Sequence, residues 1–399
     1  MKFISNRGHL MPSSPIRRLV PFADQAKAAG KHVYHLNIGQ PDIRTPDSFL
    51  DPIRNLDMPV VAYGPSAGFT SLRKKLVDYY RRFHIEVGFE DILVTTGGSE
   101  AIIFTMMAIG DEGDEIIVPE PFYTNYNGFA VEAGVNIVPI TSTIENDFKL
   151  PPIESISEKI TSRTRAILIC NPNNPTGYVY SDAELEALRK MVLKHDLFLL
   201  ADEVYREFTY DGTTHTSIMQ LPGIDDRSIM LDSVSKRYSA CGARIGMIVS
   251  RNKAVIETAL KFGMARLCPP SIEQVGVESG IDTPPEYFAE VNEEYTRRRN
   301  TMVQLLRQMP GVVAPNPKGA FYLVVRLPVD DADSFSQWLL TDFHIDKETV
   351  MLAPADGFYS TPGLGKDEVR IAYVLNVEDI KKAMHILAEA LKVYPGRIN

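Results

Sequence analysis

The 399-residue sequence has few cysteines, no long hydrophobic segment and no excess of positive charge. Its three cysteines, Cys170, Cys241 and Cys268, are widely spaced. An odd number at this spacing fits neither a disulfide framework nor a zinc site, so we expect a reducing, cytoplasmic environment and no metal. No apolar run approaches the ~18 residues of a membrane span, so we expect no membrane partner. The formal net charge of -9 argues against nucleic-acid binding.

Between residues 90 and 250, short apolar segments alternate with helical patterns. Segments such as 116–118, 166–170 and 198–202 have the composition of strands that are buried on both faces. A helix is expected over 182–195 and another from about Ser99 to Gly110. This alternation predicts an α/β fold, with a large domain over 46–283 whose central, mostly parallel sheet is flanked by helices.

The pattern changes after residue 283. Residues 284–309 follow a double proline and predict one long helix, which we expect to link two lobes. Beyond it, strands and amphipathic helices alternate again, which predicts a smaller α+β domain over 284–399. The N-terminal segment, residues 1–45, is assigned to this small domain.

Polar or conformationally special residues follow five of the expected strands. These residues are Gly97-Gly98-Ser99, Tyr123, Asn173-Asn174, Asp202 and Lys236. In open parallel sheets, ligands bind just beyond the carboxyl ends of the strands. The coincidence at five strand ends therefore predicts a ligand site at this edge of the sheet.

Lys236 has hydroxyl residues on both sides, and Arg244 follows eight residues later. A lysine in this setting is able to form a Schiff base with an aldehyde, while hydroxyls and an arginine are able to hold a phosphate. The alternative is an ordinary surface lysine in a loop. The strand-end cluster favours the first interpretation.

The other candidate groups suit a planar, charged ring. Asp202 ends an apolar strand, where an unpaired carboxylate is costly and calls for a cationic partner such as a protonated ring nitrogen. Tyr205 and Asn174 are able to bond a ring oxygen, and Arg244 with Ser233 and the turn at 98–100 is able to bind a phosphate. Ring nitrogen, phenolic oxygen, aldehyde and phosphate together describe pyridoxal 5'-phosphate (PLP).

With these residues in place, nearly the whole chain, from about Ile16 to about Leu391, resembles the fold-type I aminotransferases of class I and II, in particular the aspartate aminotransferases. The resemblance rests on an ordered set of motifs: NIGQPD at 37–42, YGPSAG at 63–68, TGGSEA at 96–101, NPNNPTG at 171–177, ADEVY at 201–205, SVSK at 233–236, GARIG at 242–246 and VRIAY at 369–373. Each motif alone is weak, but the ordered set is specific.

The resemblance implies roles for the residues around the ring. Lys236 would bind the cofactor covalently and afterwards move a proton between substrate and cofactor. Asp202 would pair with the ring nitrogen, while Tyr205 and Asn174 would hold the ring oxygen. Tyr123 stands where many members of the family place a tryptophan that stacks on the ring.

The resemblance also implies a phosphate site that is shared between two subunits of a homodimer. Gly98, Ser99 and Glu100 would bind the phosphate at a helix N-terminus, with the Glu100 side chain pointing away. Ser233 and Arg244 would bind it through their side chains. Tyr63, in a loop rich in Gly and Pro, would reach the phosphate of the neighbouring subunit.

For the substrate, the resemblance implies that Arg370 clamps the α-carboxylate, assisted by Asn174 and the Gly39 backbone. Arg266 is the candidate for a distal carboxylate, reaching across the dimer; the alternative is a structural ion pair. The expected activity is transamination between aspartate and 2-oxoglutarate by a ping-pong mechanism. The alternatives are an alanine or aromatic aminotransferase, a C–S β-lyase, or a PLP-binding regulatory protein of the same fold.

Overall fold

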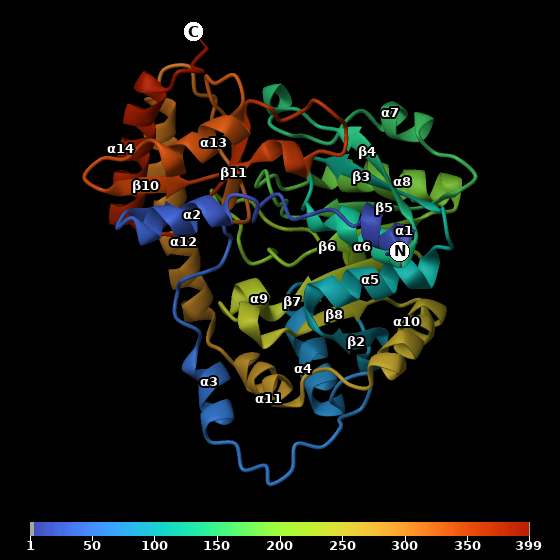
Figure 1. The fold of residues 1–399 in the computed structure, drawn as a ribbon. Helices are drawn as coiled ribbons and strands as arrows, with labels where there is room; N and C mark the ends of the chain where they lie inside the picture. The colour runs from blue at the N-terminus through green and yellow to red at the C-terminus, as the bar shows by residue number, and fades with distance from the viewer. Residues whose placement is uncertain (1–3, 399) are drawn as a thin grey trace.

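A computed structural model describes residues 4–398. Its centre is a seven-stranded sheet with helices on both faces (Figure 1). In spatial order the strands are β2 (Ile92–Thr95), β8 (Gly246–Val249), β7 (Ser228–Ser233), β6 (Phe198–Asp202), β5 (Thr164–Cys170), β3 (Glu115–Glu120) and β4 (Asn136–Thr141). Only β8 runs antiparallel to its neighbours, so the predicted mostly parallel sheet is confirmed.

Alternate residues of the strands face two hydrophobic layers, as expected for strands buried on both sides. On β6, Leu200 packs with one layer, while Leu199 and Ala201 pack with the other. The first layer contains α5 (Gly97–Ile109), α6 (Asn125–Ala133) and α10 (Lys253–Arg266). The second contains α4 (Thr70–Arg81), α7 (Ile153–Glu158) and α8 (Asp182–His195).

Local sequence explains where two of these helices begin. α8 matches its predicted bounds because Ser181 and Glu184 form a reciprocal capping box. α5 begins at Gly97, two residues earlier than predicted. There the Glu100 carboxylate accepts a hydrogen bond from the Thr96 amide at 2.7 Å, which closes the first turn.

The remaining chain forms a second lobe, drawn in orange, red and blue in Figure 1. It contains a parallel pair, β1 (His32–His35) with β10 (Glu348–Met351), and an antiparallel sheet of β11 (Ala353–Pro354), β12 (Glu368–Ala372) and β9 (Tyr322–Arg326). Its helices are α2 (Val20–Ala28), α13 (Ala332–Thr341), α14 (Val377–Val393) and the predicted long helix α12 (Pro285–Arg307). The N-terminal strand β1 thus pairs with the C-terminal lobe, although the domain boundaries at 46 and 283 stay predictions.

Three short helices complete the frame. α3 (Asp47–Arg54) packs on α11 (Ser271–Gly280), below the sheet in Figure 1. α1 (Asn6–Leu10) lies beside α6, so the N-terminal segment crosses in front of the sheet before it reaches α2 (Figure 1). No helix in the described part of the chain is long and apolar enough to cross a membrane.

Candidate active site

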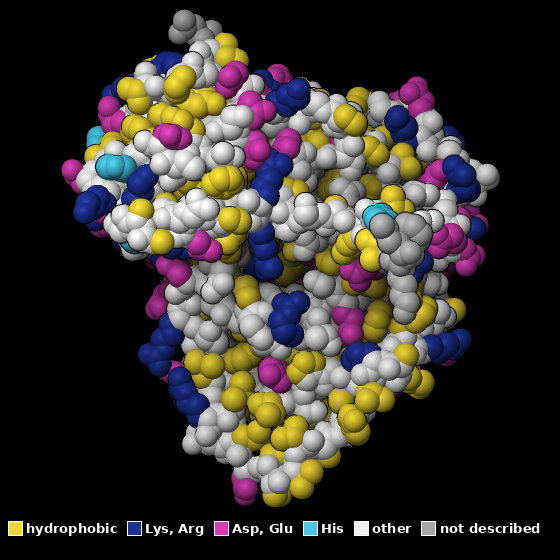
Figure 2. Space-filling view, in the orientation of Figure 1, with side chains coloured by type: hydrophobic (Ala, Val, Ile, Leu, Met, Phe, Trp, Pro, Cys, Tyr) yellow, Lys and Arg dark blue, Asp and Glu magenta, His cyan; other side chains and the backbone are white. Residues whose placement is uncertain are grey.

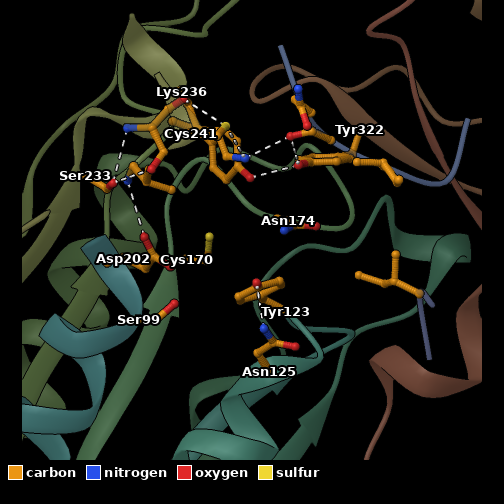
Figure 3. A pocket seen from close by; sticks show the side chains of 18 of the residues that line it. Ser99, Tyr123, Asn125, Cys170, Asn174, Asp202, Ser233, Lys236, Cys241 and Tyr322 are labelled. Carbon is orange, nitrogen blue, oxygen red and sulfur yellow. Dashed lines mark hydrogen bonds between the residues drawn. The ribbon is translucent and has the colours of Figure 1, made fainter. Parts of the chain in front are cut away.

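A cavity of about 480 Å³ lies at the carboxyl ends of the parallel strands, where the two lobes and the N-terminal segment meet. Figure 3 shows side chains from β6, the start of α5 and the second lobe converging on it. Eleven of the fourteen predicted site residues line it: Gly39, Gly98, Ser99, Tyr123, Asn174, Asp202, Tyr205, Ser233, Lys236, Arg244 and Arg370. Its volume is in the ordinary range for a small-molecule or cofactor site.

Lys236 reaches the cavity from a four-residue helix, α9 (Val234–Arg237), that follows β7 directly. Ser233 caps this helix, because its Oγ accepts a hydrogen bond from the Ser235 amide at 3.2 Å. The Lys236 Nζ donates to the Gly39 carbonyl at 2.8 Å and lies 3.7 Å from the Cys241 Sγ. The amine is thus held between the two lobes.

Asp202 is buried at the end of β6, with a hydrogen bond from the Tyr126 hydroxyl at 2.8 Å and a longer one from the Val204 amide at 3.4 Å. Burial raises the pKa of Asp202 from 3.8 to about 6, and these two bonds offset only part of that rise. A cationic group placed against this carboxylate would remove most of the cost of burying its charge. The position therefore suits a protonated ring nitrogen.

A tight turn brings Arg244 to the N-terminus of α5. Gly97 has φ +77°, and a Cβ on it would lie 2.3 Å from the Arg244 Nη2. Gly246 comes equally close, since a Cβ there would lie 2.4 Å from the Gly97 carbonyl carbon. The absence of side chains at both positions lets the guanidinium stand beside the free amides of the helix start, and this combination binds phosphate groups.

Tyr205 and Tyr322 close the side of the cavity toward the second lobe. Their hydroxyl oxygens lie 3.0 Å apart, and the Tyr322 hydroxyl donates weakly to the Gly39 carbonyl at 3.4 Å. A Cβ on Gly39 would lie only 1.6 Å from the Tyr322 oxygen. The glycine is therefore required for the close approach of the N-terminal turn to this pair.

Arg370 is a buried cation with no carboxylate partner in the described structure. Its Nη1 donates to the Asn174 Oδ1 at 3.1 Å and its Nη2 to the Asn37 carbonyl, while its Nε has no hydrogen-bond partner. The rings of Tyr322 and Phe358 flank the guanidinium, with centroids at 4.6 and 4.8 Å. Burial lowers the pKa of Arg370, because a charge without an anion is unfavourable there. An incoming carboxylate would supply the missing partner.

Comparison with known proteins agrees with this arrangement. Residues 31–387 match the family model described as aminotransferase class I and II. The chain is a class I and II aminotransferase.

Among similar proteins, an aspartate aminotransferase of Bacillus subtilis is 32% identical over 394 residues, covering 96% of this chain and 97% of that protein. An aspartate aminotransferase structure from Thermus thermophilus with maleate superposes with a TM-score of 0.89 at 28% identity, covering 98% and 100% of the two chains. An alanine aminotransferase structure from Pyrococcus furiosus gives the same score, identity and coverage. The family is generally PLP-dependent.

Three predicted residues of this aminotransferase lie outside the cavity of their own chain. Arg266 donates from its Nε to both carboxylate oxygens of Glu100 at 3.2 Å, and from its Nη2 to the Val94 carbonyl at 3.3 Å. Arg266 thus forms a structural ion pair with Glu100, which was the alternative to its role at a distal carboxylate. The Glu100 carboxylate also accepts from the Thr96 amide, and Glu100 does not line the cavity. Tyr63 is 81% exposed.

Several cavity residues of the aminotransferase escaped sequence reasoning. They are Ser14, Ile16, Arg17, Ile38, Gln40, Ile102, Asn125, Phe129, Cys170, Val204, Cys241 and Tyr322. Tyr322 and Ser14 come from segments that reach the site only through tertiary packing of the second lobe. Cys170 ends β5 and Asn125 lies at the N-terminus of α6, so the strand-end rule was able to find both.

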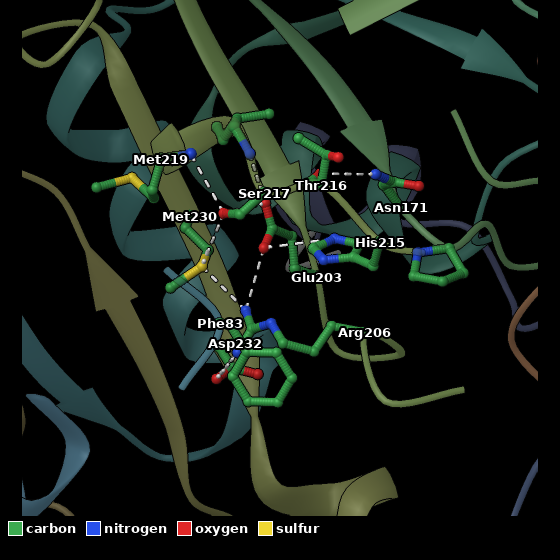
Figure 4. Close-up of polar contacts among 12 residues, drawn as sticks. Phe83, Asn171, Glu203, Arg206, His215, Thr216, Ser217, Met219, Met230 and Asp232 are labelled. Atoms are coloured by element: carbon green, nitrogen blue, oxygen red, sulfur yellow. Dashed lines mark hydrogen bonds and ion pairs between the residues drawn. The ribbon is translucent and has the colours of Figure 1, made fainter. Parts of the chain in front are cut away.

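Beneath the cavity of the aminotransferase lies a buried network of charges (Figure 4). Asp232 accepts hydrogen bonds from the Tyr80 hydroxyl at 2.9 Å, from Arg206 at 3.1 Å and from Arg237. Glu203 accepts a bond from the same Arg206 at 3.2 Å. The two guanidiniums hold the pKa of Asp232 below its ordinary value despite burial, whereas burial raises the pKa of Glu203, which has one guanidinium, to about 7.

This network lies on the face of the strand ends opposite to the cavity. At the carboxyl ends of β6 and β7, successive residues point to opposite faces of the sheet, and Glu203 directly follows the last residue of β6. Asp202 and Ser233 therefore face the cavity, while Glu203 and Asp232 join the network. Burial also lowers the pKa of His215, which lies 3.6 Å from Glu203, to about 3, so that its imidazole is neutral at pH 7.

Proposed function

We propose that this protein is a PLP-dependent aspartate aminotransferase that uses 2-oxoglutarate as the amino-group acceptor. The observation that carries the proposal is one cavity that combines a lysine amine, a buried carboxylate and two arginines. Lys236 suits the cofactor's aldehyde, Asp202 its ring nitrogen, Arg244 its phosphate, and Arg370 the substrate's α-carboxylate. These four groups match the reactive parts of PLP and the carboxylate of its substrate.

The cofactor fits two features that the chain leaves incomplete. The Asp202 carboxylate is buried without a hydrogen-bonded cation, and the Arg244 guanidinium lines the cavity together with Gly98 and Ser99 at the start of α5. Ser99 and Gly98 would add helix-terminal amides to the phosphate, Tyr205 and Asn174 would hold the ring oxygen, and Tyr123 would cover the ring. When bound, PLP supplies an electron sink that acidifies the substrate's Cα–H.

The chain's own groups then position the substrate and move the proton. Arg370 fixes the α-carboxylate, and its hydrogen bond to Asn174 fixes the guanidinium plane. Lys236 would carry the proton at Nζ. The Gly39 carbonyl, 2.8 Å from Nζ, orients this amine as a general base.

We also infer a homodimer in which each subunit completes the other's site. Large hydrophobic side chains are exposed at one end of the molecule: Val60 (72%), Val61 (61%), Tyr63 (81%), Met264 (56%) and Leu267 (51%). Figure 2 shows hydrophobic side chains gathered at the lower end, over α11 and the loop that precedes α4. Such a patch is typical of a subunit interface, and it contains Tyr63, which is proposed to reach the partner's phosphate. The cytoplasmic location stays a prediction from the cysteine content.

The visible spectrum of the purified protein tests the cofactor and the substrate together. We expect an absorption band of lysine-bound PLP that disappears on addition of aspartate, and complete loss of transamination in Lys236→Ala. Half-reactions with alanine and phenylalanine test the related aminotransferases, since an alanine aminotransferase and an aromatic-amino-acid aminotransferase are similar to this chain at 28% and 29% identity. No response to aspartate would refute the proposed substrate.

The two remaining alternatives give other outcomes in the same preparation. Pyruvate release from cystathionine would indicate a C–S β-lyase. A biological role that survives in Lys236→Ala would indicate a regulatory PLP-binding protein.

A further inference from the structure

The cavity contains one cation that the proposed chemistry does not use. Four basic side chains line it: Arg17, Lys236, Arg244 and Arg370. The last three are assigned to the amine, the phosphate and the α-carboxylate. Arg17 is the remaining positive charge, and it comes from the N-terminal segment rather than from the sheet. Figure 2 shows Lys and Arg side chains gathered around the hollow between the two lobes.

The backbone on either side of Arg17 is fastened at three places. The Asn37 side chain donates to the Ile16 carbonyl at 3.4 Å, and the Asn37 carbonyl in turn accepts from Arg370. Pro15 packs so closely on Gly357 that a Cβ there would lie 2.2 Å from the Pro15 Cβ. The first of these contacts links the segment to Arg370 through a single intervening residue, Asn37.

The third fastening is an ion-pair cluster at Arg18. Its guanidinium donates to both oxygens of Asp356 at 2.8 and 3.2 Å, and its Nε lies 2.7 Å from the Asp333 Oδ1. Arg18 thus anchors the segment to the second lobe. Arg17, its neighbour, is exposed and lines the cavity.

The Arg17 guanidinium has neither a hydrogen-bond nor an ion-pair partner within residues 4–398, whereas Arg18 has two carboxylates. The cavity offers Arg17 no carboxylate of its own except Asp202, which is buried at the opposite, sheet side. Arg266, the residue predicted for this role, is already paired with Glu100 in its own chain. Among the described basic residues that line the cavity, Arg17 is the one left uncommitted for a second anionic group on the substrate.

We infer that Arg17 binds the distal carboxylate of four- and five-carbon dicarboxylic amino and oxo acids, and so determines substrate specificity. This inference rests on the proposed function. Arg370 and Arg17 then hold the two ends of one substrate, and the Asn37 bridge sets the spacing between them. The distal contact is charge-assisted but lies at an exposed rim, so its effect is at the lower end of the range for charged hydrogen bonds.

Steady-state kinetics of Arg17→Gln in the PLP-loaded enzyme tests the inference. We expect the ratio of kcat/KM for aspartate to that for alanine to fall at least about 10-fold, mainly through KM for aspartate. Arg7→Gln is the matched control, since Arg7 lies in the same segment, outside the cavity, and pairs only at 3.7 Å with exposed Glu112. This control should keep the wild-type ratio.

Equilibrium binding gives a second readout that needs no turnover. By calorimetry, Arg17→Gln should raise the Kd for maleate, a dicarboxylate, relative to the Kd for propionate by about 10-fold. The inference would be overturned if Arg17→Gln kept the wild-type selectivity for dicarboxylates. It would also be overturned if Arg266→Gln lost this selectivity and Arg17→Gln did not. If the wild type itself showed no preference for aspartate over alanine, both the proposed substrate and the role of Arg17 would be refuted. If the wild type showed the preference and Arg17→Gln retained it, only the role of Arg17 would be refuted.

Discussion

Replacing Asp202 by Asn should stabilise the cofactor-free protein while it abolishes activity. The carboxylate is buried, and burial raises its pKa from 3.8 to about 6. This rise corresponds to about 3 kcal/mol of unfavourable free energy when the group is ionised. Asparagine removes the charge, keeps nearly the same volume, and is able to donate to the Tyr126 hydroxyl, which now donates to Asp202. We therefore expect a gain of about 1–3 kcal/mol in the free energy of unfolding.

The sign of the effect depends on pH. Because the folded-state pKa is raised, the folded protein binds the proton of Asp202 more tightly than the unfolded chain between pH 3.8 and about 6. The wild type thus loses stability as the pH rises through this window, and the full cost is present above it. The advantage of Asp202→Asn should be absent near pH 4 and complete at pH 8.

Denaturant unfolding of the wild type and of Asp202→Asn at several pH values, with and without PLP, measures this difference in the free energy of unfolding. With PLP the order should reverse, since the ring nitrogen then compensates the carboxylate and the cofactor stabilises the wild type more. Asp225→Asn is the control, because Asp225 is 61% exposed in its pair with Arg251. A cofactor-free Asp202→Asn that is less stable than the wild type at pH 8, or a difference that does not vary with pH, would refute this account.

Two further substitutions test the frame of the site. Gly39→Ala should lower kcat at least about 10-fold, because the added Cβ would lie 1.6 Å from the Tyr322 oxygen and must displace the Tyr322–Tyr205 pair. Gly242→Ala is the control and should keep the wild-type kcat, because the space around Gly242 is open. Equal kcat values for the two variants would contradict the steric argument. Asp232→Asn should cost about 3–5 kcal/mol in denaturant unfolding, because it leaves Arg206 and Arg237 buried with too little negative charge; a loss below about 1 kcal/mol would show that the network relaxes around the change.

Sequence reasoning located the part of the site that belongs to the sheet. Asp202 and Lys236 were predicted to lie together because the carboxyl ends of parallel strands share one edge, and they line one cavity. The direction of β8 was not predictable, since an apolar strand of four residues has the same composition in either orientation.

Contacts made by side chains between distant segments could not be predicted in this way. Tyr322 lies in a strand of the second lobe, and nothing in its sequence surroundings indicates that its hydroxyl meets Tyr205. Arg266 was selected for its charge and its place before two prolines, but charge alone does not reveal that Glu100 lies within reach. Arg17 escaped notice because the path of the N-terminal segment is set by its packing on Gly357 and Asp356.

The opposed faces of β6 and β7 have an evolutionary consequence. Each strand residue that serves the cofactor is adjacent in sequence to one that belongs to the buried network, as Asp202 is to Glu203. A substitution at the ends of these two strands therefore disturbs both cofactor binding and the buried charge network, and natural selection should remove it. Arg17 lies outside this network and has no side-chain partner within residues 4–398, so descendants of one ancestor are free to acquire new substrates at this position while they inherit the reaction unchanged.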